Sequence, residues 1–361
     1  MTFAVQADAD VSITHSNAPL SVARANQGTA TSVGDKAFIA GGVLNGYHAT
    51  VDIYDGSAGT WSATNMSQAR GRLASTGVGD LALFGGGFAT TGRSAVVDIY
   101  DASGSTWTTA ALSEAREYPA ATSVGNLAMF AGGYSDSGYS DVVDIYNAST
   151  NAWSTATLSV ARNHLTATTV GDLAMFAGGQ DALGYSDVVD IYNVSTNTWS
   201  TASLSQARMK LGATTVGNLA MFGGGYTGSD SAQVDIYNES TDTWSTSTLP
   251  SGPRRGVGAT TAGDVAFFGH GYLWTKLVDL YDPSQPAGSE WSTFEFDGAR
   301  KWHDGPMTTS VGDQALFAGD SQYQLAGDQR VDIYTVTPEP ATMSLLALGG
   351  LAILKRRRRG V

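Results

Sequence analysis

Short runs of apolar residues, separated by glycine pairs and by Asn/Ser/Thr turns, recur along most of the chain. The best preserved copy covers residues 165–199 and reads LTATTVGDLAMFAGGQDALGYSDVVDIYNVSTNTW. Runs of about four to eight residues bounded by such turn residues predict β-strands rather than helices. This copy is therefore expected to form four strands, at residues 166–170, 173–177, 188–192 and 199–201.

Seven copies of this pattern can be aligned by three landmarks. An arginine recurs every 46 residues, at Arg24, Arg70, Arg116, Arg162, Arg208, Arg254 and Arg300. A VDIY-like element supplies an aspartate, at Asp52, Asp98, Asp144, Asp190, Asp235, Asp279 and Asp332. Six copies then contain a tryptophan, at Trp61, Trp107, Trp153, Trp199, Trp244 and Trp291. A unit of this length cannot bury its apolar face alone, so the copies are expected to stack as a solenoid, propeller or array.

The two ends of the repeat region predict a closed ring. Residues 18–24 match residues 156–162, which follow a tryptophan-containing strand, so residues 11–14 lie where the other copies have that strand. The seventh copy ends at Tyr334 and lacks it. We expect the N-terminal strand to complete the last copy, because a ring removes the open strand edges of a linear array. The first strand of each copy is rich in Thr, Ala, Ser and Gly, which suits an innermost position.

The repeated pattern of an apolar strand, a glycine pair, a tyrosine and a tryptophan resembles the kelch repeat. In the best copy it is carried by Phe176-Ala177-Gly178-Gly179, Tyr192 and Trp199. The resemblance covers about residues 10–335 and implies an all-β, seven-bladed kelch-like β-propeller whose last blade is closed by the N-terminal strand. The last two copies depart from the pattern, with Gly269-His270-Gly271 and Gly319-Asp320, and are expected to be the least regular. The family implies a binding platform, with catalysis in a minority of its members.

Composition and charge narrow the possible partners. The formal net charge is −13, and a basic cluster at residues 355–359 offsets an even more acidic remainder. Such a charge excludes nucleic acid as a partner. The chain has no cysteine, which excludes disulfides, thiolate metal sites and cysteine nucleophiles. It also excludes the chemistry of the copper oxidases that resemble this fold, because they depend on a tyrosine cross-linked to a cysteine.

One face of the ring carries the candidate binding residues. The alternating strand directions bring the residues after each arginine and the loops after each glycine pair to the same side, which we call the mouth face. Two positions after the arginines stand the dissimilar residues Asn26, Arg72, Tyr118, His164, Lys210, Gly256 and Trp302. From these and the loops we select Arg72, Tyr118, His164, Lys210, Trp302, Tyr139, Tyr185 and Trp274 as a candidate ligand-binding surface. The alternative is that they are solvated loop residues without a function.

Three other recurring features allow two interpretations each. The arginines either form a basic ring at the channel mouth or pair with carboxylates and carbonyls between blades, and their repetition favours the second. The VDIY aspartates either bind calcium or make structural hydrogen bonds, and the absence of a clustered oxygen-ligand loop favours hydrogen bonds. His164, His270 and His303 show no metal-ligand spacing, so we expect no metal and no cofactor.

Catalysis is the less favoured alternative. Sialic-acid isomerases are similar in using kelch propellers, with acid and base residues in the central pocket. Glu117, His164 and Arg72 offer such groups, but their spacing does not make a constellation. We therefore expect no catalytic residues, and keep an extracellular carbohydrate-active, isomerase-like enzyme as the alternative.

The composition changes abruptly after Tyr334. A Pro-Glu-Pro element precedes the mostly apolar residues 341–354, and these precede a basic cluster. As a helix this apolar run spans only about 21 Å, short of the roughly 30 Å of a hydrocarbon core. The order of these parts resembles the PEP-CTERM sorting signal, carried here by Pro338, Glu339, Pro340, Lys355, Arg356, Arg357, Arg358 and Arg359. A plain tail anchor is the alternative.

The resemblance to the sorting signal implies an exosortase-type membrane protease as a partner. It also implies transient membrane contact through the apolar run, and export to the bacterial envelope, the cell surface or the medium, often alongside exopolysaccharide production. Residues 1–9 lack a basic start and a long apolar run, although Ala7-Asp8-Ala9 has the form of a cleavage site. We interpret these residues as the remnant of an export signal or a disordered start, and expect the true start to lie upstream.

The sequence thus predicts three segments: residues 1–9, a propeller at 10–335 and a sorting tag at 336–361. The predicted function is an exported cell-surface or extracellular-matrix binding module. Its ligand is predicted to be a polysaccharide or an envelope protein. A purely structural surface protein is a further alternative.

Overall fold

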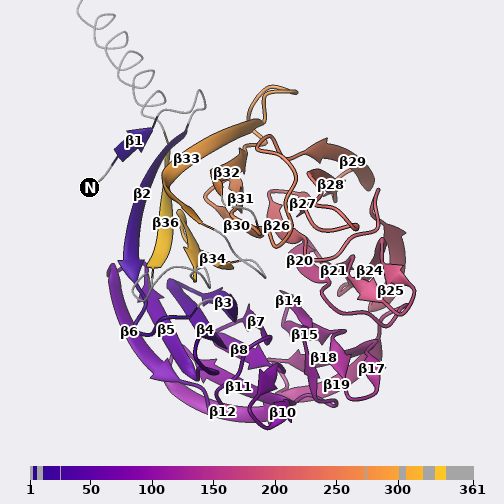
Figure 1. Cartoon of the computed structure of the whole chain (residues 1–361). Coiled ribbons are helices and arrows are strands. Elements are labelled where there is room, and N and C mark those ends of the chain that lie inside the picture. The colour runs from indigo at the N-terminus through magenta and orange to yellow at the C-terminus, as the bar shows by residue number, and fades with distance from the viewer. Residues whose placement is uncertain are drawn as a thin grey trace, which may run out of the picture.

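Four-stranded antiparallel sheets radiate from a common centre in the computed structural model (Figure 1). The structure describes residues 3–5, 11–24, 26–272, 275–300, 306–319 and 330–338. Within these ranges the regular elements are all strands. The all-β prediction is therefore confirmed.

The first three sheets run from inner to outer strand in chain order. The first comprises β3 (Asn26–Val33), β4 (Lys36–Val43), β5 (Thr50–Asp55) and β6 (Thr60–Asn65). The second comprises β7 (Ala74–Val78), β8 (Leu81–Gly85), β11 (Val96–Asp101) and β12 (Thr106–Ala111). The third comprises β14 (Ala120–Val124), β15 (Leu127–Ala131), β18 (Val142–Asn147) and β19 (Ala152–Thr157).

The next three sheets repeat this order. The fourth comprises β20 (Thr166–Val170), β21 (Leu173–Ala177), β24 (Val188–Asn193) and β25 (Thr198–Ser203). The fifth comprises β26 (Gly212–Val216), β27 (Leu219–Gly223), β28 (Gln233–Asn238) and β29 (Thr243–Thr248). The sixth comprises β30 (Gly258–Ala262), β31 (Val265–Gly269), β32 (Thr275–Tyr281) and β33 (Trp291–Arg300), with a register shift between Thr275 and Leu277. This irregularity falls in one of the two copies expected to be least regular.

The last sheet joins the two ends of the chain. It comprises β34 (Met307–Val311), β35 (Gln314–Ala318), β36 (Arg330–Pro338), β2 (Val11–Pro19) and β1 (Phe3–Val5). Strand β2 pairs with β36 from Val11 opposite Pro338 to Pro19 opposite Arg330, so the predicted closure by an N-terminal strand is confirmed. Strand β1 adds an outer strand that the repeat pattern did not predict.

The innermost strands β3, β7, β14, β20, β26, β30 and β34 contact one another in sequence, and β34 contacts β3, so the ring is closed (Figure 1). Their small side chains allow this close approach: the hydroxyls of Thr122 and Thr169 are 2.9 Å apart across two sheets, as are those of Thr168 and Thr215. At Gly77 a Cβ would lie 2.3 Å from the carbonyl oxygen of Ser32, so the second sheet needs glycine there. The prediction of small residues on the inner strand is confirmed.

Apolar cores lie between adjacent sheets rather than within one sheet. Tyr192 and Trp199 of the fourth sheet pack against Val143 and Ile145 of the third. Tyr54 and Trp61 of the first sheet pack in the same way against the last sheet, next to Ile333. The tyrosines and tryptophans of these repeats therefore fill the wide outer space between blades.

The recurring arginines are buried structural groups. Arg162 Nη2 lies 2.7 Å from Asp190 Oδ2 and donates to the carbonyl oxygen of Phe176 at 3.0 Å. The other oxygen of Asp190 accepts the backbone N–H of Ser159, which lies in the connection from the third sheet. Equivalent pairs are Arg24–Asp52, Arg70–Asp98, Arg116–Asp144, Arg208–Asp235 and Arg254–Asp279. The interpretation that the arginines and aspartates pair inside the protein is confirmed for the first six copies. In the seventh copy the side chain of Arg300 lies outside the described residues, and Asp332 contacts His15 at 2.9 Å.

The glycine pairs connect the arginines of the second to sixth blades to the preceding blade. The backbone N–H of Gly133 donates to the carbonyl oxygen of Arg162 at 2.9 Å. At Gly132, with a φ of 64°, a Cβ would lie 2.6 Å from that same oxygen. Burial lowers the pKa of the Arg162 guanidinium, and Asp190 opposes this shift. Burial lowers the pKa of Arg24 to about 10, so it too stays charged near neutral pH.

The sorting signal falls almost entirely outside the described residues. Pro338 ends β36, whereas Glu339, Pro340 and the basic cluster lie beyond the described part of the chain. The apolar run at 341–354 lies there as well. Among the residues that are described, no helix is long and apolar enough to cross a membrane.

Removing one partner of a buried Arg–Asp pair is expected to destabilise the propeller strongly. Asp190→Ala leaves the guanidinium of Arg162 buried without its carboxylate, and should lower the free energy of unfolding by about 3–5 kcal/mol. Urea denaturation measures this loss. The control is Asp136→Ala, which removes a carboxylate that is 89% exposed and paired with Arg93, and should cost at most about 1 kcal/mol. Equal losses in both variants would contradict a structural role for the buried pair.

Candidate functional site

A ring of residues in the left-handed backbone conformation surrounds the mouth of the central channel. Arg72, Tyr118, His164 and Lys210 have φ angles of 59°, 53°, 50° and 55°. Gln27 and Gly256 complete the described part of this ring, with φ angles of 60° and 63°. Residues other than glycine rarely adopt this conformation, because the Cβ then crowds the backbone. We call these six residues the mouth ring.

Backbone hydrogen bonds connect the mouth ring from blade to blade. Arg72 N–H donates to Gln27 O at 2.6 Å, and Tyr118 N–H to Arg72 O at 2.8 Å. The same contact joins Lys210 to His164 at 3.2 Å and Gly256 to Lys210 at 2.8 Å. Gln27, rather than Asn26, therefore holds the first position of the ring. Counting two residues from Arg24 was wrong by one, because the first copy carries one extra residue between Arg24 and Gln27.

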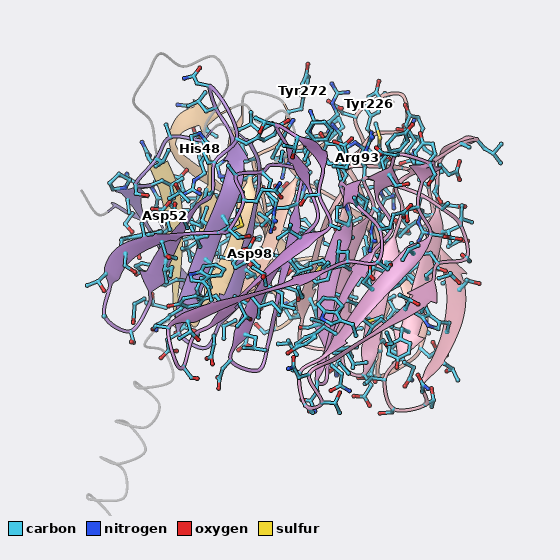
Figure 2. All side chains as sticks on the ribbon, turned by 90° about the horizontal axis from the view of Figure 1, so that it is seen from below. His48, Asp52, Arg93, Asp98, Tyr226 and Tyr272 are labelled. Atoms are coloured by element: carbon cyan, nitrogen blue, oxygen red, sulfur yellow. The ribbon has the colours of Figure 1, made fainter. Side chains whose placement is uncertain are left out.

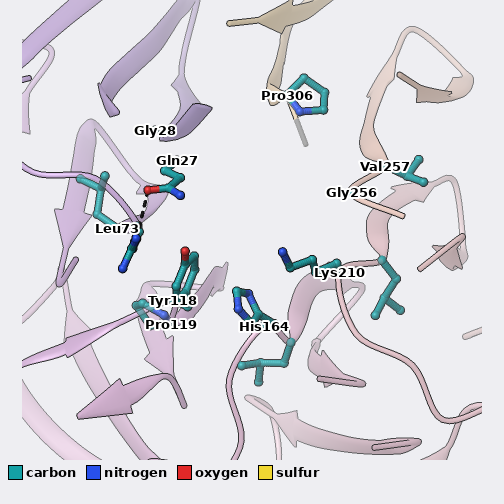
Figure 3. A pocket seen from close by; sticks show the side chains of 13 residues that line it. Gln27, Gly28, Leu73, Tyr118, Pro119, His164, Lys210, Gly256, Val257 and Pro306 are labelled. Atoms are coloured by element: carbon teal, nitrogen blue, oxygen red, sulfur yellow. Dashed lines mark hydrogen bonds between the residues drawn. The ribbon is translucent and has the colours of Figure 1, made fainter. Parts of the chain in front are cut away.

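The mouth ring lines a cavity of about 190 Å³ (Figure 3). The residue after each ring position also lines it, and most of these residues are apolar: Gly28, Leu73, Pro119, Leu165, Leu211 and Val257. Pro306 contributes from the last sheet. The cavity thus combines diverse polar side chains with buried apolar ones. The structure brings four of the predicted residues together here: Arg72, Tyr118, His164 and Lys210.

Aromatic and cationic side chains pack closely along one side of the cavity. The rings of Tyr118 and His164 have centroids 4.1 Å apart. The guanidinium of Arg72 lies 5.3 Å from the ring centroid of Tyr118, and its Nε donates to Gln27 Oε1 at 3.0 Å (Figure 3). Tyr118, His164 and Lys210 turn toward the same space. These contacts hold the side chains of four neighbouring blades in one arrangement.

Glu117 connects the cavity to the outer loops. One carboxylate oxygen accepts a hydrogen bond from Arg72 at 2.7 Å and the other accepts one from Arg93 at 3.0 Å. The Glu117 side chain is only 8% exposed. Burial acts to lower the pKa of Arg72, but the hydrogen bond to Glu117, together with the charges of Glu117, Tyr118 and Tyr47, outweighs it, so the pKa is raised. Glu117 therefore fixes both arginines in place.

The predicted loop residues lie farther out than the mouth ring. Tyr139, in β17 (Gly138–Tyr139), packs edge-on against Tyr134 with centroids 5.2 Å apart. Tyr185, in β23 (Gly184–Tyr185), packs edge-on against Tyr226 at 5.7 Å. Neither belongs to the described lining of the cavity. Trp274 and Trp302 lie outside the described residues.

Short hairpins build these outer loops in three blades. The strands are β9 (Phe88–Ala89), β10 (Gly92–Arg93), β13 (Arg116–Glu117), β16 (Tyr134–Ser135), β17, β22 (Gln180–Asp181) and β23. In the third blade, Glu117 of β13 pairs with Tyr134 of β16. The hairpins therefore extend the surface outward from the mouth ring.

Sequence reasoning missed the residue that directly follows each glycine pair. In several blades it is an aromatic that stacks with an arginine: Arg93 lies over Phe88 and Tyr134 at 6.0 and 5.0 Å. Arg255 lies between Tyr226 and Tyr272 at 4.4 and 3.9 Å. The missed pattern is the variation at Val43, Phe88, Tyr134, Gln180, Tyr226 and Tyr272, each next to an unvarying glycine. Figure 2 shows Arg93, Tyr226 and Tyr272 on one face, with Asp52 and Asp98 within the body of the molecule.

The described residues contain no group of three or more histidine, aspartate or glutamate side chains placed to hold a metal ion. His164 belongs to the mouth ring and His270 is buried in the sixth blade. His303 lies outside the described residues. Polar, aromatic and apolar side chains line the candidate site.

Comparison with protein families gives two matches. The model described as the KLHDC2/KLHL20/DRC7 Kelch-repeats domain matches residues 27–209, slightly more than half of the chain. The model of the PEP-CTERM protein-sorting motif matches residues 336–359. Among curated proteins no relative matches the chain.

The backbone strain of the mouth ring can be measured at His164. His164→Gly and His164→Val both delete the ring that stacks on Tyr118. A difference between their free energies of unfolding therefore reports the cost of the left-handed backbone conformation. Valine is β-branched and fits a φ of 50° poorly, so His164→Val should be less stable than His164→Gly by about 1–2 kcal/mol. Urea denaturation of both variants measures the difference. Equal stabilities would mean that position 164 is not strained.

Proposed function

This chain belongs to the kelch-repeat family and carries a PEP-CTERM sorting motif, and on that premise we propose that it binds its ligand at the mouth ring. The sorting motif indicates an exported protein of the cell envelope that is processed by an exosortase-type protease. Kelch repeats indicate a protein-binding module. The proposal concerns where the ligand binds and what kind of ligand it is.

The observation that carries the proposal is the left-handed backbone at diverse, non-glycine positions. Gly256 occupies the same place in the sixth blade without strain. Each non-glycine residue costs about 1 kcal/mol or more there. Gln27, Arg72, Tyr118, His164 and Lys210 are kept in spite of this cost, and they differ from one another on a repeated framework. Side chains with different chemistry held in strained positions around a cavity support a role in recognition.

The size of the cavity favours an extended ligand. About 190 Å³ is below the roughly 300–1,000 Å³ of pockets that enclose a whole small molecule. We infer that one bulky side chain or one sugar unit enters the cavity while the rest of the ligand lies on the outer loops. Leu73, Leu165 and Leu211 in the lining favour an apolar side chain from an envelope protein. A polysaccharide is the second candidate, because Tyr118 and the polar ring offer stacking and hydrogen bonds.

The proposal assigns no catalytic step to this site. Among the groups considered for acid–base chemistry, both oxygens of Glu117 already accept hydrogen bonds from Arg72 and Arg93. The ring of His164 packs against the ring of Tyr118, with centroids 4.1 Å apart. These contacts support a rigid binding surface rather than a proton-transfer pair.

A binding measurement with glycine substitutions tests the proposed site. Tyr118→Gly combined with His164→Gly removes both rings but relieves the left-handed backbone, so the fold should be retained. Binding of the labelled protein to an isolated envelope fraction should be saturable, and the variant should bind about tenfold or more weakly. The matched control is Asp101→Asn combined with Glu239→Gln, which changes residues near the hairpin links of the opposite face and should bind like the original protein.

The chemical class of the ligand can be identified by treating the envelope fraction with a protease or with periodate before the binding measurement. Loss of binding after protease digestion identifies a protein, and loss after periodate oxidation identifies a polysaccharide, which a glycan array then resolves. Unchanged binding by the Tyr118/His164 variant would place the binding site away from the mouth ring and refute the proposal.

A further inference from the structure

The sorting motif and the closing blade overlap in sequence. The motif begins at residue 336, whereas β36 continues to Pro338. Val336, Thr337 and Pro338 therefore belong to both, and they pair with Ile13, Ser12 and Val11 of β2. The beginning of the sorting signal is thus part of the folded propeller.

Val336 and Thr337 are held by side-chain contacts as well as by strand pairing. Val336 is 4% exposed and lies in one apolar cluster with Ile13 and Tyr334. Its backbone N–H donates to the carbonyl oxygen of Asp313 at 2.8 Å. The hydroxyl of Thr337 donates to the carbonyl oxygen of Ser12 at 3.0 Å. Releasing Val336 would require opening the apolar core between the sixth and last blades, which also contains Phe267 and Phe294.

A protease must bind its substrate as an extended strand with free backbone groups. The backbone of residues 336–338 is already engaged by β2, and β2 is itself covered by β1 on its other edge. Cleavage within a paired strand needs local unfolding, which costs most in buried strands. The closed blade therefore resists cleavage of the peptide bonds that precede Pro338.

We propose that the peptide bond cut during removal of the sorting signal lies C-terminal to Pro338, and that β2 sets this limit. In the cut, the acyl carbon on the propeller side passes to water, giving a carboxylate, or to the amine of an acceptor, giving an amide. The downstream residue leaves with a free amino group. The mature protein keeps the whole of β36 and hence a closed ring.

The C-terminal residue of the processed protein tests this proposal. The mature protein is isolated from the envelope or medium of the bacterium that makes it, and its C-terminal peptide is sequenced by mass spectrometry. A last residue at 338 or later, short of Val361, is expected. A last residue at 337 or earlier, or an uncut chain ending at Val361, would overturn the proposal.

A disulfide staple tests whether β2 must leave before the cut. The chain has no cysteine, so Ser12→Cys combined with Thr337→Cys places the only two thiols on directly paired residues. The oxidised protein should be processed to the same extent as the single variant Ser12→Cys. Loss of processing in the oxidised protein, restored when the disulfide is reduced, would show that β2 separates first and would refute the limit. Urea denaturation of the stapled protein checks that its fold is intact.

Discussion

The buried arginine of each repeat is the contact on which the rest of the structure depends. Arg162 contacts the third strand of its own blade through Asp190, the end of the second strand through Phe176, and the preceding blade through Gly133. A buried ion pair adds little net stability compared with apolar packing, but losing one partner is costly. The contact therefore acts mainly as a geometric constraint. It fixes the angle and spacing at which each blade meets the next.

This constraint explains why the mouth ring can vary. The ring position lies two residues after the arginine in the second to sixth blades, so the buried guanidinium holds the backbone on one side of it. Blade-to-blade hydrogen bonds such as Tyr118 N–H to Arg72 O use only backbone atoms. The side chain is then free to differ from blade to blade without altering the framework. A repeated scaffold with one variable position per unit is well suited to recognition.

The repeat pattern allowed the framework to be predicted because its determinants are local and recur. The strands, the tight links and the pairing of β2 with β36 all follow from residues at fixed offsets. The predicted strand at 199–201 is longer in the structure, Thr198–Ser203, because a strand edge that faces solvent carries no apolar boundary. The extra residue before Gln27 escaped prediction because arithmetic from Arg24 cannot detect an insertion in a single copy.

The side-chain network of the mouth could not be predicted in the same way. Arg72 and Glu117 meet across 45 residues of sequence and two blades. Arg255 is placed between Tyr226 and Tyr272 by loops that differ in each copy. Such contacts depend on side-chain directions and on the blade angle, neither of which a repeat alignment contains. The sequence indicated which face varies, and only the structure shows which residues touch.

The strand directions also relate the mouth to the C-terminal end of the propeller. Strand β36 starts beside the mouth face and ends at Pro338, next to the link between β34 and β35, where Val336 N–H meets Asp313 O. The described chain therefore ends on the face opposite the mouth ring. That face exposes a carboxylate at the links Asp35, Asp80, Asp172, Asp264 and Asp313, which disfavours close contact with an anionic lipid surface. The mouth ring therefore lies on the side of the propeller that faces away from the described C-terminal end.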